Sequence, residues 1–144
     1  MKLRVFAAAL AALALSASAA FAVEAHKLVI QVDENDPAIM SLALNNAENV
    51  EAYFAEKGEA AIIEIVAYGP GLKMYTADSP MKDRISALSL QHENMQFTAC
   101  GNTLAKMSKA AGHDVALLSE AKIVPAGVVR IMELQSEGYA YVRP

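Results

Sequence analysis

Short apolar segments alternate with longer segments of helical periodicity along most of the chain. Residues 28–32 form a β-branched run that ends in turn-forming polar residues, and this pattern predicts a first strand. Asp36 and Pro37 are typical of a helix start, because Asp can cap a helix and Pro fits its first position. Gly58 is predicted to end this helix. The apolar face of the helix is marked by spacings of three and four between Met40, Ala43, Ala47, Val50 and Phe54.

Further strands and helices follow in the same alternating order. Residues 60–68 are nearly all apolar, which fits a strand covered by helices on both faces. Residues 95–100 alternate as a third strand does, and residues 122–125 and 139–142 predict two short strands. Helical patterns lie between these strands. The alternation predicts an α/β protein: a three-layer α/β/α sandwich around a mostly parallel sheet of about five strands. Ligands of such folds bind at the carboxyl ends of the strands.

The first 22 residues have the pattern of a secretory signal peptide. Lys2 and Arg4 precede an apolar run over residues 5–15, and Ala20-Phe21-Ala22 supplies a small-residue cleavage site. An uncleaved membrane anchor is disfavoured, because two serines interrupt the apolar run and no cationic group follows it. We therefore predict a signal peptide over residues 1–22 and one periplasmic domain over residues 23–144, with no membrane association after cleavage.

Composition and charge exclude several classes of protein. The 144 residues are 55% hydrophobic and 19% charged, and one cysteine excludes a disulfide scaffold. The net charge of −4 includes the two cationic residues of the leader, so the remaining chain is more acidic still and is not expected to bind nucleic acid. His26, His92 and His113 are isolated, and the glycines at 69 and 71 form no phosphate-binding loop. No metal and no cofactor are predicted.

Cys100 is the candidate reactive residue. It is predicted to lie at the carboxyl end of the third strand, two or three residues before a helix begins. The N–H groups and the positive dipole end of a helix favour a thiolate over a thiol, so a cysteine there can act as a nucleophile or carry a persulfide. The alternative is a buried structural cysteine, which is the commoner fate of a free thiol.

Six further residues are candidates for ligand binding. Asn46 and Asn49 lie within the first helix, where Asn is a poor helix former and needs polar partners. Gly69 and Gly71 follow the second strand, and Asn102 and Thr103 follow Cys100. We expect the last four to supply backbone and side-chain donors around the sulfur, and the two asparagines to meet the glycine loop or a ligand.

Several segments together resemble the DsrE/DsrF-like family, in particular its small YchN-like branch. The similar segments are residues 45–49, 63–72, 97–104 and 124–128, with Leu134-Gln135, Gly138-Tyr139, Tyr141 and Pro144 at the end of the chain. The resemblance implies the three-layer fold, assembly into trimers or hexamers, and a cysteine that accepts and passes on persulfide sulfur, here Cys100. Tyr68 stands where the family often has His, which departs from the pattern.

Two functions are compatible with these features. The first is an exported sulfur-handling protein with Cys100 as persulfide carrier and with a sulfur donor or acceptor protein as partner. The second is a non-catalytic oligomeric module that binds a small ligand or a protein, because no second catalytic group lies near Cys100 in the sequence. A homotrimer or homohexamer is expected in either case. Leu72, Met74 and Tyr75 are predicted to lie in an exposed loop, where such side chains mark an interface.

Overall fold

A computed structural model describes residues 25–144, and the predicted signal peptide lies outside the described residues. Within these residues the chain forms a five-stranded parallel sheet in the order β4-β3-β2-β1-β5. The strands are β1 (His26–Val32), β2 (Ala61–Ala67), β3 (Met95–Cys100), β4 (Ala121–Val124) and β5 (Ala140–Val142). The predicted α/β sandwich with a parallel sheet is confirmed.

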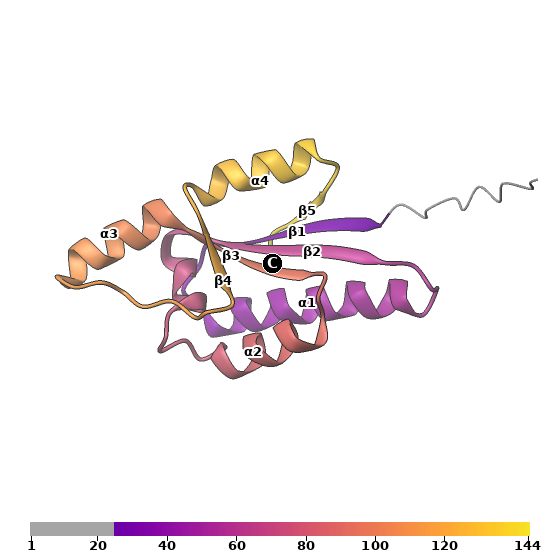
Figure 1. Cartoon of the computed structure of the whole chain (residues 1–144), viewed down its shortest axis with the longest axis horizontal. Coiled ribbons are helices and arrows are strands. Elements are labelled where there is room, and N and C mark those ends of the chain that lie inside the picture. The colour runs from indigo at the N-terminus through magenta and orange to yellow at the C-terminus, as the bar shows by residue number, and fades with distance from the viewer. Residues whose placement is uncertain (1–24) are drawn as a thin grey trace, which may run out of the picture.

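Helices cover both faces of the sheet (Figure 1). They are α1 (Pro37–Ala55), α2 (Lys82–Gln91), α3 (Gly101–Ala111) and α4 (Gly127–Ser136), with a 3₁₀ helix, η1 (Gly69–Tyr75). Helices α1 and α2 lie on one face and α4 on the other, while α3 projects past the end of the strands (Figure 1). The chain steps from β1 through β4 in one direction and then returns to β5, so right-handed crossovers place α4 opposite α1 and α2.

The face under α1 and α2 holds the larger apolar core. Alternate residues of the three central strands point to it, and α1, α2 and η1 pack against them. Its largest fully buried side chains include Ile30, Met40, Leu44, Ile65, Tyr75, Ile85 and Phe97. The predicted helical stripe of α1 is correct, because Met40, Ala43 and Ala47 are all buried. The Asp36 carboxylate accepts the Ala38 N–H at 2.7 Å, as expected of a helix cap.

The segment after β2 differs from the prediction. Leu72, Met74 and Tyr75 are fully buried, and the Tyr75 hydroxyl donates to the Ile65 carbonyl at 2.7 Å. The segment folds as η1 against the end of the sheet, where a Cβ on Gly71 would lie 2.3 Å from the Val32 carbonyl oxygen. The expectation of an exposed loop is therefore wrong, because these side chains complete the apolar core of the chain.

Helix α4 covers the opposite face with a smaller apolar contact. Val29, Val66, Ile131 and Leu134 form a buried cluster there. Gln31, Glu64 and Thr98, which are polar, are buried in the strands as well. In residues 25–144, none of the helices has the length and apolar character that a bilayer span requires.

Candidate functional site

Cys100 is the last residue of β3 and the N-cap of α3, which begins at Gly101. The predicted strand end is correct. The two or three residues expected between Cys100 and the helix are not there, because α3 begins at the next residue and the thiol lies directly at the helix start. The side chain projects to the α4 side of the sheet, because a Cβ on Gly127 would lie 3.2 Å from the Cys100 Cβ. Cys100 is buried, with 6% of its surface exposed.

Two helices begin next to the sulfur. Helix α3 starts at Gly101, and α4 starts at Gly127, which follows the end of β4. In β-sheet register Cys100 pairs with Val124, so the two adjacent strands bring both helix starts together. Gly127 permits this approach, since any Cβ would also lie 3.1 Å from the Tyr68 Cβ. Helix N-termini carry unpaired N–H groups and positive dipole ends, which favour an anion.

The Thr103 hydroxyl connects the sulfur to the loop after β2. Its Oγ1 accepts the Gly69 N–H at 3.0 Å, which leaves the hydroxyl proton for another acceptor. The Thr103 hydroxyl also lowers the pKa of the Cys100 thiol. The Gly69 N–H thus holds in place a hydroxyl group that favours the thiolate.

These groups decide the charge of the sulfur. Burial raises the pKa of the Cys100 thiol, and it is the largest single influence. Hydrogen bonds from the Thr103 hydroxyl and from the N–H groups of Gly127, Thr103 and Asn102 together outweigh it, so the pKa lies below its ordinary value. The Asn102 N–H donates to the Pro125 carbonyl at 3.1 Å, which ties the start of α3 to the segment after β4.

Tyr68 lies on the other side of Gly127 and belongs to a polar cluster at the ends of β1 and β5. Burial is the main cause that raises its pKa, and the Asp33 carboxylate adds to it, so the phenol stays protonated. Gln31 accepts the Tyr141 hydroxyl proton at 2.7 Å, and it offsets a small part of the rise in the pKa of Tyr68. Arg143 donates from Nε to Asp33 at 2.8 Å. Tyr68 is thus a neutral hydrogen-bonding group beside the thiol site.

The structure brings four of the six predicted ligand residues to this end of the sheet. Thr103 and Asn102 lie in the first turn of α3 and lower the pKa of the Cys100 thiol, and Gly69 acts through Thr103. Gly71 has a different role, because its N–H donates to the Tyr68 carbonyl at 3.1 Å and its Cα packs on the end of β1. The prediction that Gly71 donates to the sulfur site is wrong.

Asn46 and Asn49 do not belong to the site. Helix α1 begins beside the carboxyl end of β1 and packs on the face opposite to the Cys100 side chain. Asn46 lies nine residues along it, about 14 Å from its start. Asn46 is half-buried and Asn49 is exposed, next to the apolar stripe rather than within it. The expectation that they meet the glycine loop is wrong, because the helix axis leads away from it.

Gly127 and the cluster at Tyr68 were missed in the sequence. A glycine opening a helix after a strand was visible, but its contact with Cys100 depends on the adjacency of β3 and β4. Among residues 25–144, no group of three or more His, Cys, Asp and Glu side chains is arranged to hold a metal ion.

The comparison with solved structures finds a protein of similar fold and sequence. A protein of unknown function from Methanobacterium thermoautotrophicum, MTH1491, has a solved structure that is similar, with a TM-score of 0.69 and 34% sequence identity. The match covers 83% of this chain and 99% of that one. No protein-family model and no curated protein matches the sequence.

Proposed function

The chain belongs to the same family as MTH1491, and we propose that it is an exported sulfur carrier whose Cys100 holds a persulfide. One observation carries the proposal: the N-termini of two helices and the Thr103 hydroxyl converge on the chain's one cysteine and lower the pKa of its thiol. The function of MTH1491 is unknown, so the proposal depends on this geometry and on the resemblance of the sequence to sulfur-relay proteins.

The surroundings of Cys100 suit sulfur transfer from a persulfide or polysulfide donor. The thiolate attacks the outer sulfur of the donor, a new S–S bond forms at Cys100, and the donor S–S bond breaks to release a thiolate or a polysulfide shortened by one sulfur. No external oxidant is required. The negative charge ends on the outer sulfur of the persulfide, next to the N–H groups of the helix starts, which favour it.

Mass spectrometry tests this proposal. The protein is incubated with polysulfide, separated from excess reagent and weighed intact. We expect a gain of one sulfur atom that is lost on reduction, and we expect none in Cys100→Ser. A Cys100→Ser protein that gains the same mass, or a folded wild-type protein that gains none, would contradict the proposal.

A non-catalytic binding module is the second candidate. The observation that favours it is the burial of Cys100, which leaves 6% of the residue exposed. Alkylation by a small reagent such as iodoacetamide separates the two functions. A sulfur carrier reacts in the folded state, whereas a structural cysteine reacts at the rate of global unfolding.

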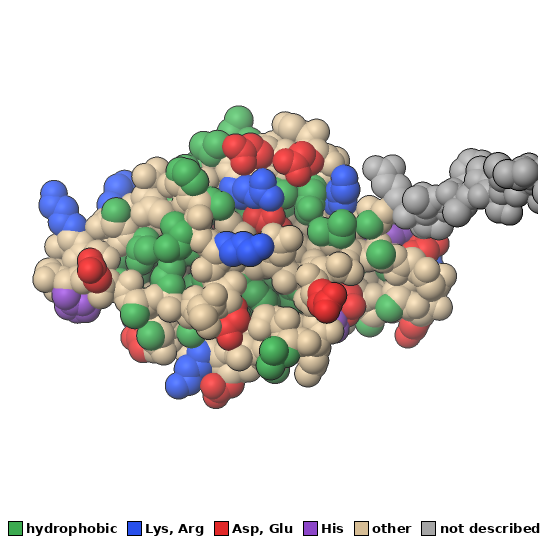
Figure 2. All heavy atoms as spheres, viewed as in Figure 1, with side chains coloured by type: hydrophobic (Ala, Val, Ile, Leu, Met, Phe, Trp, Pro, Cys, Tyr) green, Lys and Arg blue, Asp and Glu red, His purple; other side chains and the backbone are tan. Residues whose placement is uncertain are grey.

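Assembly into a homotrimer or homohexamer is part of the proposal. It is supported by large apolar side chains on the surface of β4 and α4, namely Ile123, Val128, Val129 and Met132, which are 48–64% exposed. In Figure 2 apolar side chains gather between α3 and β4, while charged side chains follow α4. Light scattering tests this assembly, and the mass of a single chain at micromolar concentration would exclude it.

A periplasmic location, with cleavage after Ala22, also belongs to the proposal. It is supported by the signal-peptide pattern of residues 1–22. N-terminal sequencing of the protein from a periplasmic extract is expected to begin at Val23.

A further inference from the structure

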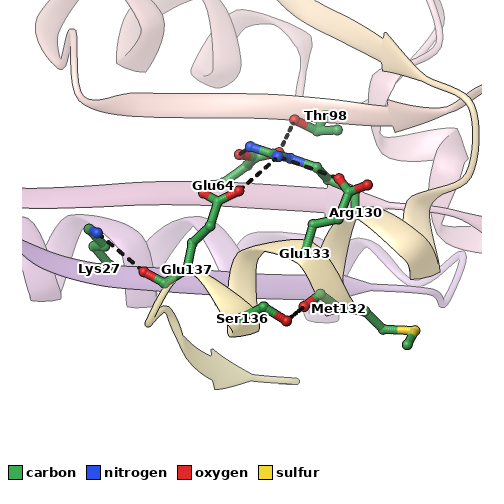
Figure 3. A network of polar contacts seen from close by, with 8 residues as sticks. All are labelled: Lys27, Glu64, Thr98, Arg130, Met132, Glu133, Ser136 and Glu137. Carbon is green, nitrogen blue, oxygen red and sulfur yellow. Dashed lines mark hydrogen bonds and ion pairs between the residues drawn. The ribbon is translucent and has the colours of Figure 1, made fainter.

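Glu64 is a buried carboxylate in the middle of the sheet. It lies on β2, is 3% exposed and points to the α4 side. Three donors bind it from two neighbouring elements (Figure 3). The Thr98 hydroxyl of β3 donates to its Oε1 at 2.7 Å, and Arg130 of α4 donates from Nε to Oε1 at 2.9 Å and from Nη2 to Oε2 at 2.8 Å. Both oxygens of the carboxylate thus accept hydrogen bonds from side chains of the same fold.

The two-point bond to Arg130 holds a defined part of α4. The Arg130 backbone N–H donates to the Ala126 carbonyl at 3.0 Å and closes the first turn of the helix, which contains Gly127. The apolar contacts of α4 include Ile131 and Leu134, which come later in the helix. The bond between Arg130 and Glu64 therefore holds the first turn of α4, the turn whose Gly127 N–H faces Cys100.

The network also reaches the strand of the cysteine. Thr98 lies two residues before Cys100 on β3, and its side chain is on the same face of the sheet. Glu64 thus connects β3 and α4, the two elements whose relative position sets the distance between the thiol and Gly127. A buried ion pair of this kind adds little to stability over apolar side chains of equal volume, but its geometry is specific.

We propose that Glu64 and Arg130 are positioning residues, which fix the first turn of α4 on the sheet so that the Gly127 N–H lies against the Cys100 sulfur. The importance of this placement for sulfur transfer depends on the proposed function, but the placement itself does not. Glu133 and Glu137 also face Arg130, at 3.6 and 3.9 Å, and both are more than half exposed, so they do not form the anchor.

The decisive variant removes both charges together. Replacing Arg130 alone leaves a buried carboxylate without its partner and adds an uncompensated negative charge near the thiol. Glu64→Gln combined with Arg130→Met keeps the net charge and the bond to Thr98 but removes the anchor. The Cys100 pKa is measured by the ultraviolet absorbance of the thiolate, with the same background in Cys100→Ser subtracted.

We expect the pKa of Cys100 to rise in this double variant, with the thiolate fraction at neutral pH about threefold to tenfold lower. Hydrogen exchange of the Gly127 amide is expected to become faster. An unchanged pKa in the folded double variant overturns the proposal.

Arg130→Lys separates the anchor from its charge and serves as the deciding variant if the double variant fails to fold. Lysine keeps the positive charge but not the planar two-point bond. We expect the pKa of Cys100 to rise by less than in the double variant. A wild-type pKa would overturn the proposal, because it would mean that the charge of residue 130 matters and its two-point bond does not.

Arg84→Met is the matched control. Arg84 of α2 is also a partner of a glutamate, Glu48 of α1, but on the opposite side of the sheet. Its loss is expected to leave the pKa of Cys100 unchanged. Because the pKa is read without any sulfur donor, a protein that fails to take up sulfur while its pKa follows these variants would refute the proposed function and support the anchor.

Discussion

The two faces of the sheet are built on different principles. Under α1 and α2 the strands contribute apolar side chains, and the core there extends through η1 to Tyr75 and Phe97. Under α4 the apolar cluster is small, and the same strands contribute the buried polar residues Gln31, Glu64 and Thr98. Apolar packing is non-directional, whereas hydrogen-bonded pairs specify orientation. The first face supplies most of the stability, and the second orients groups around Cys100.

The largest effect is expected from truncation on the apolar face. Phe97→Ala removes a buried ring from β3 and should lower the free energy of unfolding by about 3–5 kcal/mol, measured by urea denaturation. The pKa of Cys100 should stay the same in the folded variant, because the ring points away from the thiol.

Leu134→Ala on the α4 face should lower the free energy of unfolding by about 2–5 kcal/mol and raise the pKa of Cys100. Equal pKa changes in both would refute the division between the faces.

The contrast between the faces also explains what the sequence predicts well. The order of strands and helices, the buried stripe of α1 and the strand end at Cys100 follow from local periodicity, which the core preserves. The segment at Leu72 was misjudged because apolar side chains after Gly69-Pro70-Gly71 have the pattern of an exposed loop. Its burial depends on η1 folding back over the sheet, a tertiary contact without a local signal.

The candidate site was partly predictable for the same reason. Thr103 and Asn102 follow Cys100 directly, so their place at the helix start was visible in the sequence. Gly127 is far from Cys100 in sequence, and its approach requires β4 to pair with β3. Asn46 was wrongly included, because composition alone does not tell which end of the sheet a helical residue reaches.

Thr103→Val is expected to have the next largest effect. Valine has nearly the same shape, but the sulfur loses a hydrogen bond and the Gly69 N–H loses its acceptor. A hydrogen bond to a charged group contributes roughly 1.5 kcal/mol, so the pKa of Cys100 should rise and the thiolate fraction at neutral pH fall about tenfold. The absorbance titration measures this change. Thr103→Ser restores the hydroxyl and should restore the pKa, and a wild-type pKa in the valine variant would refute the role of the hydroxyl.

A smaller effect is expected from Gly127→Ala. The new Cβ would lie 3.1–3.3 Å from atoms of Tyr68 and Cys100, so the start of α4 must shift by a few tenths of an ångström. The Gly127 N–H then moves away from the sulfur, and the pKa of Cys100 should rise by less than in Thr103→Val. Val128→Ala changes an exposed side chain in the same turn and is the control. A larger change in the control than in Gly127→Ala would mean that contact with the sulfur is not the cause.

The smallest effect is expected at the exposed edge of the polar face, in Arg143→Met. The bond from Arg143 is the main cause that holds the pKa of Asp33 below its ordinary value. A carboxylate with a lowered pKa stabilises the fold at pH values above its unfolded pKa, and this contribution is lost as the pH falls through the folded value. The variant should therefore raise the pKa of Asp33, measured by NMR titration, and slightly lower the urea midpoint at pH 7. Below both pKa values the two proteins should unfold at the same urea concentration, since a protonated Asp33 no longer forms an ion pair with Arg143.

In Arg143→Met the pKa of Cys100 should not change, because Arg143 contacts the carboxyl end of β1 rather than the start of α4. A shift in the Cys100 pKa as large as that in Thr103→Val would show that the cluster around Asp33 and the thiol site act as one unit.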